Sequence, residues 1–260
     1  MWGVARAFSG RVLLRIEDHD RTRSKSVFEQ AILEDLEWLG FQPDEPLARQ
    51  SEREAKYGDA LATLEAAGLV YACACSRKSI GAATVPFEGE RRYPGTCRDA
   101  GLDGGAARAR RVRLERETLS FRDLRLGPIE QVPSEQAGDI LARDRHGHWT
   151  YQFAVVVDDL DQGVDLVIRG EDLLASTGRQ IQLARLLGRK TPPLFLHHPL
   201  IRRADGHKLS KSNRDTGIRD LRASGWSVER VLGEAASALG LFAGQPASMA
   251  DLVGRLKETA

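Results

Sequence analysis

The residues best suited to phosphate chemistry are two lysines in residues 208–212, KLSKS, directly after the turn-forming residues 204–206. A loop of this composition can fold over a triphosphate. The ammonium groups of Lys208 and Lys211 would then offset negative charge that builds on phosphoryl oxygens during a displacement. By composition alone the same string is more often a solvated loop. Lys208 and Lys211 are therefore candidate catalytic residues whose role depends on the rest of the chain.

Three cysteines form a second candidate site, because Cys73, Cys75 and Cys97 are close in sequence. Three soft thiolates suit tetrahedral zinc, and a structural zinc site needs a fourth ligand. Water or histidine is the usual choice, but no histidine occurs between residues 20 and 145. The alternative is three buried, free cysteines.

Three apolar runs predict the strands that would position these groups. Residues 11–16 end at Glu17 and further polar residues, and residues 164–170 also end in polar residues. Residues 151–157 form a continuous apolar run of the kind buried in parallel sheets.

Helices are predicted between and after these strands. Ser26 and Glu29 have the spacing of a capping box at a helix start. The predicted helices cover or begin at residues 26–39, residues 52–67, residues 176–187, Ser227 and Ser248. Strands that feed helices in this order predict βαβ units and an open α/β sheet.

Composition narrows the class of protein. The 260 residues carry a net charge of +1, so any contact with nucleic acid must come from a local basic patch. One such patch is an arginine cluster, for which a solvated charged surface is the alternative: Arg108, Arg110, Arg111, Arg113 and Arg116. No apolar stretch reaches the ~20 residues that span a bilayer, and the first ten residues are not typical of a signal peptide. An odd number of cysteines argues against a disulfide scaffold, so we expect a cytoplasmic protein without membrane contact.

Five segments in order resemble the glutamyl branch of class I aminoacyl-tRNA synthetases. They are RIEDHDRTR at 15–23, QSER at 50–53, YQFAVVVDD at 151–159, IRGEDL at 168–173 and KLSKS at 208–212. The resemblance implies an α/β fold: a Rossmann-like class I synthetase catalytic domain with a zinc-binding insertion and a helical C-terminal segment.

This resemblance also implies a division of the chain into four parts. Residues 1–72 would be the first part of the catalytic domain, N-terminally incomplete, and residues 73–137 the zinc-containing insertion. Residues 138–205 would be the second part of the catalytic domain, and residues 206–260 the KLSKS loop with the helical C-terminal segment.

Only residues 213–260 follow the KLSKS segment, too few for the large anticodon-binding region of a glutamyl-tRNA synthetase. The chain therefore resembles the short glutamyl-queuosine tRNA(Asp) synthetase family. That family activates L-glutamate with ATP and esterifies it onto queuosine in the anticodon of tRNA(Asp). We expect a monomer that uses ATP, with Mg²⁺, and one structural Zn²⁺.

Site residues follow from the same resemblance, position by position. Glu17, Tyr151 and Arg169 match family residues that contact glutamate, and Lys211 matches the lysine assigned to ATP. Arg169 could hold a carboxylate in a two-pronged pair, and its alternative is a salt bridge to Asp165 or Glu171.

The resemblance also decides the fourth metal ligand. This paralogue family uses a Cys-x-Cys, Tyr, Cys set for its zinc, which here is Cys73, Cys75, Tyr93 and Cys97.

The sequence lacks the RFAPSPTG-like strand and the His-x-Gly-His-type motif with which the family begins, and residues 1–7 already resemble the helix that follows them. Two interpretations are open: a start codon assigned too far downstream, or a truncated, inactive paralogue. A fragment of a discriminating glutamyl-tRNA synthetase is the third alternative.

Overall fold

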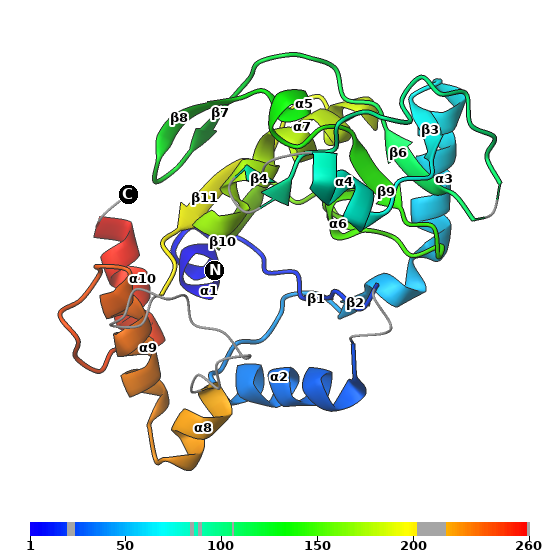
Figure 1. Cartoon of the computed structure of the whole chain (residues 1–260). Helices are drawn as coiled ribbons and strands as arrows, with labels where there is room; N and C mark the ends of the chain where they lie inside the picture. The colour runs from blue at the N-terminus through cyan, green and yellow to red at the C-terminus, as the bar shows by residue number, and fades with distance from the viewer. Residues whose placement is uncertain (20–23, 84–85, 88–89, 106, 202–216, 259–260) are drawn as a thin grey trace. The chain divides into compact units, whose positions relative to one another are not determined.

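The computed structural model describes residues 1–19, 24–83, 86–87, 90–105, 107–201 and 217–258. Contacts between Cα atoms divide the chain into two compact units, drawn together in Figure 1 and described here separately. Unit 1 contains residues 1–16, 22–49 and 198–260, and unit 2 contains residues 17–21 and 50–197.

Unit 1 is mainly helical. Its elements are α1 Trp2–Ala7, β1 Arg15–Ile16, α2 Ser26–Trp38, β2 Ala48–Arg49, α8 Ile218–Ala223, α9 Val228–Ala238 and α10 Met249–Glu258. Strands β1 and β2 pair in parallel, and α1 packs against α10 (Figure 1). Leu232, Ala236 and Leu252 form an apolar cluster between α9 and α10.

The helix starts in unit 1 match the predictions in part. Ser227 caps α9, because its hydroxyl accepts a hydrogen bond from the Arg230 N–H at 3.2 Å. The predicted capping box at Ser26 was wrong: α2 begins at Ser26 itself, and its N-cap residue, Lys25, makes no side-chain cap. The strand predicted over residues 11–16 is shorter, since only Arg15–Ile16 pairs with a neighbour.

Unit 2 contains most of the strands. Its first elements are η1 Gln50–Glu52, α3 Glu54–Ala66, β3 Val70–Cys73, α4 Arg77–Ala83, β4 Pro86–Phe87, β5 Glu90–Arg91 and β6 Ala109–Val112. They are followed by β7 Leu119–Asp123, β8 Gly127–Gln131, α5 Pro133–Gln136, β9 Ile140–Arg143, α6 Tyr151–Asp161, β10 Leu166–Gly170, η2 Glu171–Ser176, α7 Thr177–Leu186 and β11 Leu194–His198.

Two sheets position the side chains of unit 2. One has the strand order β10-β11-β7-β8, in which β11 runs parallel to β7 and β7 forms an antiparallel hairpin with β8. The other is the antiparallel sheet β3-β6-β9. The β7–β8 hairpin comes from the predicted insertion, yet it shares a sheet with strands of the second catalytic part.

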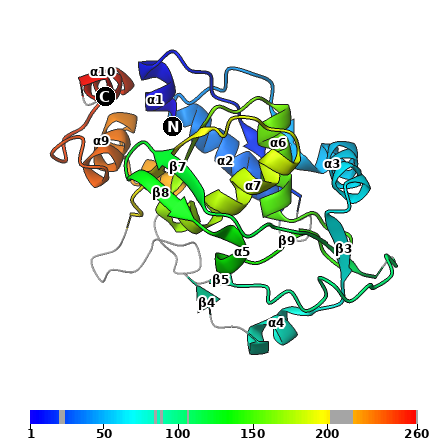
Figure 2. The same cartoon turned by 90° about the horizontal axis from the view of Figure 1, so that it is seen from above.

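The strand predicted at residues 151–157 was wrong, because Tyr151–Asp161 forms helix α6. Every residue from Phe153 to Asp158 is buried, so this part of the helix is covered on all sides. A continuous apolar run cannot be distinguished from a buried strand by periodicity alone. Helix α6 packs against α7 and α3, which lie on its sides in Figure 2.

Two predicted helices of unit 2 are confirmed. Helix α3 ends just before Gly68 and α7 just before Gly188, and both glycines have positive φ, 71° and 95°. This left-handed conformation is the usual way to close a helix and favours glycine.

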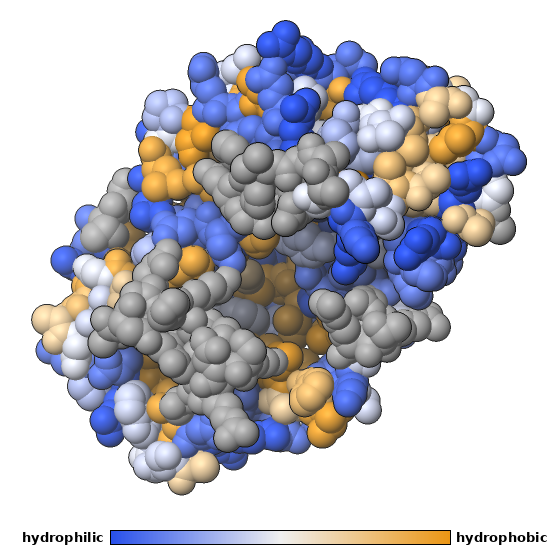
Figure 3. Space-filling view, in the orientation of Figure 1, coloured by the Kyte–Doolittle hydropathy of each residue, from blue (hydrophilic) through white to orange (hydrophobic). Residues whose placement is uncertain are grey.

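The face shown in Figure 3 is mostly hydrophilic, with apolar residues in small groups. Phe28 and Ile32 on α2 are about half exposed, so the apolar side of this helix is not fully covered. In the described part of the chain, no helix has both the length and the apolar character required to cross a membrane.

Candidate active site and metal site

The segments RIEDHD and QSER are hydrogen-bonded to each other in unit 2. Asp18 accepts hydrogen bonds from the N–H and the hydroxyl of Ser51, at 2.8 and 2.6 Å. His19 Nδ1 lies 2.6 Å from Gln50 Oε1, which can only accept, so Nδ1 carries the proton. The chain that follows Glu17 is thereby fixed, while Glu17 itself is exposed.

Helix α6 joins this region through the buried carboxylate of Asp158. Gln50 Nε2 donates to it at 2.8 Å, Arg53 Nε at 2.6 Å, and the Tyr57 hydroxyl at 3.0 Å. A buried carboxylate is stable only when it is paired and hydrogen-bonded, and here both conditions hold. QSER therefore ties the start of unit 2 to α6, which begins at Tyr151.

Arg169, near the end of β10, is held by three hydrogen bonds. Its Nε donates to His197 Nε2 at 3.0 Å, its Nη1 to Gln180 Oε1 at 2.6 Å, and its Nη2 to Thr177 Oγ1 at 2.8 Å. The predicted salt-bridge alternative to Glu171 does not hold, because Glu171 pairs with Arg125 at 2.8 Å. The guanidinium is thus oriented by uncharged acceptors.

Tyr151 lies close enough to Arg169 to act on its pKa. Burial lowers the pKa of Arg169, and the nearby Tyr151 and Asp159 act in the opposite direction. An arginine stays protonated in proteins despite such a shift. The site therefore presents a fixed, partly buried positive charge beside a phenol, which suits an anionic ligand.

His197 and Asp123 extend this arrangement and were not predicted as site residues. His197 Nδ1 lies 2.7 Å from Asp123 Oδ2, and both side chains are fully buried. Asp123 also accepts N–H bonds from Arg125 and Leu126 at the β7–β8 turn, at 2.9 and 2.8 Å. Burial opposes ionisation of Asp123, but these hydrogen bonds hold its pKa below the usual value.

The predicted catalytic residues Lys208 and Lys211 lie outside the described residues.

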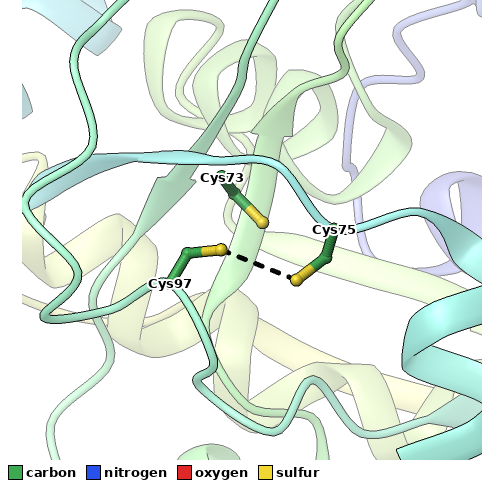
Figure 4. Close-up of side chains that lie close together, drawn as sticks. All are labelled: Cys73, Cys75 and Cys97. Carbon is green, nitrogen blue, oxygen red and sulfur yellow. Dashed lines mark hydrogen bonds between the residues drawn. The ribbon is translucent and has the colours of Figure 1, made fainter.

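The three cysteines meet at the end of β3, as the spacing predicts. Their sulfur atoms all lie within 4.8 Å of one another, and Cys75 Sγ is 3.6 Å from Cys97 Sγ. Figure 4 shows the side chains pointing toward a common centre from β3, the residues after it and the loop at Cys97. None of them forms a disulfide.

Tyr93 completes this cluster with an oxygen. Its hydroxyl lies 3.5 Å from Cys73 Sγ and accepts the N–H of Cys97 at 2.9 Å. Around a tetrahedral zinc, Zn–S and Zn–O bonds place two sulfurs about 3.8 Å apart and a sulfur about 3.5 Å from an oxygen. The Cys75–Cys97 and Cys73–Tyr93 separations match those values, and all three sulfurs lie within 4.8 Å of one another, so the donor set of Cys73, Cys75, Tyr93 and Cys97 suits a structural zinc ion.

Protonation in this cluster is uneven without a metal. Burial raises the pKa of Cys75 to about 11, and it also raises the pKa of Tyr93. For Cys97, burial is outweighed by hydrogen bonds, the first from the backbone at Ala74, and its pKa is lowered. Metal binding would displace the remaining protons, as it does at any thiolate site.

Arg111 packs directly on the cluster. Its Nε donates to Cys73 Sγ at 3.4 Å, and its guanidinium lies 3.6 Å from the centre of the Tyr93 ring. Arg111 is buried, with 7% of its surface exposed. The arginine cluster is therefore not one solvated surface, because this member faces inward, and Arg113 lies over the ring of Tyr71.

Comparisons with known proteins show the family of this chain. The sequence pattern of the catalytic domain of class I tRNA synthetases (E and Q) matches residues 1–245. The glutamyl-Q tRNA(Asp) synthetase of Cupriavidus metallidurans is 45% identical over 86% of this chain and 72% of its own length. That of Leptothrix cholodnii is 43% identical over 94% of this chain and 84% of its own length.

A solved structure supports the fold. The glutamate tRNA ligase from Elizabethkingia meningosepticum, in complex with its amino acid, superimposes with a TM-score of 0.78 at 24% identity. The match covers 97% of this chain but spans only 59% of that ligase. The chain therefore belongs to the glutamyl-Q tRNA(Asp) synthetase family of class I aminoacyl-tRNA synthetases, which are enzymes of the ligase type.

Proposed function

We propose that this chain activates L-glutamate with ATP and transfers the glutamyl group to queuosine in the anticodon of tRNA(Asp). The named relatives support the reaction class and the tRNA. The observation that carries the choice of amino acid is Arg169, a partly buried cation oriented by three uncharged acceptors.

Arg169 would bind the side-chain carboxylate of glutamate. Burial of a cation is costly unless an anion pairs with it, and the groups that bond the Arg169 guanidinium are uncharged. The nearby Asp159 supplies part of the opposite charge, and the rest is open to an anionic ligand. Glutamate would supply that charge, while uncharged glutamine would not. Tyr151 would donate or accept one further hydrogen bond, and Glu17 would accept from the substrate ammonium group.

The first chemical step would be an in-line displacement. The glutamate α-carboxylate attacks the α-phosphorus of ATP, a P–O bond forms, and the bond to the leaving pyrophosphate breaks. Lys208 and Lys211 are proposed to offset charge on the phosphates, and Mg²⁺ would supply further charge neutralisation there.

In the second step a queuosine hydroxyl attacks the carbonyl carbon of glutamyl-adenylate. The new ester bond forms, the carbonyl–phosphate bond breaks, AMP leaves, and the hydroxyl proton passes to solvent. Because the first step uses ATP and the second uses tRNA, we propose the cytoplasm as the place of action. We also propose a monomer as the working form.

Zinc is proposed to be structural and not to contact substrate. Cys73, Cys75, Tyr93 and Cys97 would hold it and thereby fix the end of β3 and the loop at Cys97 relative to β6. One structural ion in a chain segment with few strands is a common source of local stability.

The test is glutamate-dependent exchange of pyrophosphate into ATP, followed by transfer of labelled glutamate to tRNA. We expect exchange without tRNA, and transfer to tRNA(Asp) with queuosine but not to the same tRNA without it. Charging of tRNA(Glu) at its 3′ end would instead favour the glutamyl-tRNA synthetase alternative. Glutamate binding without any exchange would favour the inactive paralogue.

A further inference from the structure

His197 is placed between a buried carboxylate and the proposed substrate arginine, and its protonation is fixed by both neighbours. Asp123 Oδ2, at 2.7 Å from Nδ1, belongs to an ionised group that can only accept a hydrogen bond. Arg169 Nε, at 3.0 Å from Nε2, can only donate. One neutral tautomer satisfies both contacts: Nδ1 carries the proton, and Nε2 carries the lone pair.

We propose that His197 is a positioning residue for Arg169, with its tautomer set by Asp123. This inference rests on the proposed function, since the anion that Arg169 receives is taken to be the side-chain carboxylate of glutamate. Asp123 is the last residue of β7, His197 lies in β11 and Arg169 in β10, and these three strands belong to one sheet.

The surroundings of Asp123 show that this carboxylate serves the histidine and is fixed itself. Its Oδ1 accepts the N–H groups of Arg125 and Leu126, while its Oδ2 accepts the N–H of His197 at 3.0 Å as well as the ring Nδ1–H. All four contacts hold the carboxylate in one orientation. The histidine ring therefore has little freedom to turn away from Arg169.

Thr177 strengthens the same geometry from α7. Its hydroxyl accepts from Arg169 Nη2 at 2.8 Å and lies 3.3 Å from His197 Nε2, to which it can donate. The guanidinium is thus held on one edge by a histidine and a threonine that are both fully buried. Protonation of Nε2 would place an N–H against the N–H of Arg169, and the arrangement would break.

Three variants separate a positioning role from a merely structural one. His197→Phe keeps an aromatic ring but removes the acceptor, whereas His197→Gln offers a carbonyl oxygen as a replacement acceptor. Asp123→Asn keeps the shape of the carboxylate but can donate to Nδ1, which would allow the other tautomer.

Glutamate binding, measured by calorimetry on the whole zinc-loaded chain, should weaken about 10- to 100-fold in His197→Phe, the loss expected for one hydrogen bond to a charged group. We expect His197→Gln to recover most of that loss and Asp123→Asn to resemble His197→Phe. The free energy of unfolding, measured by urea denaturation, serves to normalise all variants to folded protein. Equal glutamate affinity in the folded His197→Phe variant would overturn the inference.

The tautomer supplies a readout that does not depend on glutamate. Nitrogen NMR of labelled, ligand-free protein distinguishes N–H from unprotonated ring nitrogens, and the His197 signals are those lost in His197→Phe. We expect an unprotonated Nε2 at neutral pH, and a protonated Nε2 would refute the positioning. If the unchanged chain binds no glutamate, the proposed function is wrong and glutamate is not the ligand of Arg169. The spectrum would still show whether Nε2 of His197 can accept the hydrogen bond from Arg169.

Discussion

Arg111 and Arg169 both lie within unit 2, but the partners of their guanidinium groups differ in charge. Arg111 contacts a cysteine sulfur and the ring of Tyr93, groups that become anionic when a metal is bound. Arg169 bonds a neutral histidine, an amide oxygen and a hydroxyl. In the proposed zinc-bound state the partners of Arg111 would be charged, whereas the hydrogen-bond partners of Arg169 are uncharged and Asp159 acts on it from nearby.

The proposed functions of the two sites would account for this difference. Three thiolates and a phenolate around Zn²⁺ leave a net negative charge, which a buried arginine can reduce. The proposed substrate site differs: the guanidinium of Arg169 is oriented by uncharged acceptors, and the nearby Asp159 is the carboxylate that acts on its pKa, so an anionic substrate would add a further counter-ion. Changing either arginine should reveal which of these roles it has.

The largest effect is expected for Arg169→Gln. Truncating one partner of a desolvated charge pair costs about 2–5 kcal/mol, which is about 30-fold or more in glutamate affinity. Arg169→Lys should recover part of this loss, because an ammonium keeps the charge but not the planar, two-pronged geometry. Calorimetric titration with glutamate measures both.

The matched control for Arg169 is Arg145→Gln, an exposed arginine of unit 2 whose side chain contacts His146. It should bind glutamate like the unchanged chain. Wild-type glutamate affinity in Arg169→Gln would mean that the substrate does not use the charge of Arg169. The proposed difference in role between Arg169 and Arg111 would then be wrong.

Removal of one proposed metal ligand tests the zinc site on which Arg111 packs. Cys75→Ser should lower zinc affinity by about 100-fold, since the binding free energy of a structural zinc is shared among four ligands. Elemental analysis after dialysis against a chelator measures the bound metal, and hydrogen exchange should show faster opening of residues 73–97. Thr118→Ser, an exposed change outside this segment, should leave both unchanged. Full zinc content in Cys75→Ser would remove this cysteine from the ligand set.

How far the sequence predicts these sites depends on how local their contacts are. Cysteine is rare in this chain, so the spacing of Cys73, Cys75 and Cys97 was enough to predict that their sulfurs meet. The contact of Asp123 with His197 spans 74 positions and depends on the parallel pairing of β7 with β11. No local pattern reports such a pairing, and Asp123 falls in the part of the chain predicted to be an insertion.

The fold was predictable to a similar, limited extent. Helices closed by Gly68 and Gly188 were predicted because a left-handed glycine is a local signal. Residues 151–157 were assigned to a strand because a continuous apolar run suits a buried strand as well as a buried helix. Tyr151, the first residue of α6, nevertheless lies close enough to Arg169 to act on its pKa.

A smaller effect is expected for Arg111→Met, which keeps the length and apolar stem of the side chain. Loss of a group that orients a metal ligand typically costs about 10- to 100-fold in metal affinity. Arg111→Lys should retain part of the metal affinity, because lysine keeps the positive charge. Competition with a chromophoric chelator measures the affinity, and replacement of zinc by cobalt should shift the thiolate absorption bands in Arg111→Met.

Arg116→Met is the control for this change, because its side chain is 82% exposed and pairs with Glu135. It should leave metal affinity and the cobalt spectrum unchanged. Equal spectra and affinities for the Arg111 and Arg116 variants would show that the charge of Arg111 does not act on the cluster.

The smallest effect concerns acid stability in the region of Arg169. Burial, and then the charge of Arg169, hold the pKa of His197 below its ordinary value of 6.5, although Asp123 acts in the opposite direction. Below that pH the unfolded chain binds more protons at His197 than the folded chain does, so its contribution to stability is present above pH 6.5 and is lost on acidification. Asp123 has a lowered pKa too, but its contribution to stability is lost only below its ordinary value of 3.8.

His197→Gln should therefore lose less stability than the unchanged chain between about pH 7 and pH 5. Urea denaturation at each pH measures this difference, and zinc release, common to both proteins, cancels in it. Equal pH slopes would mean that His197 is not held neutral, which would also weaken its proposed role beside Arg169.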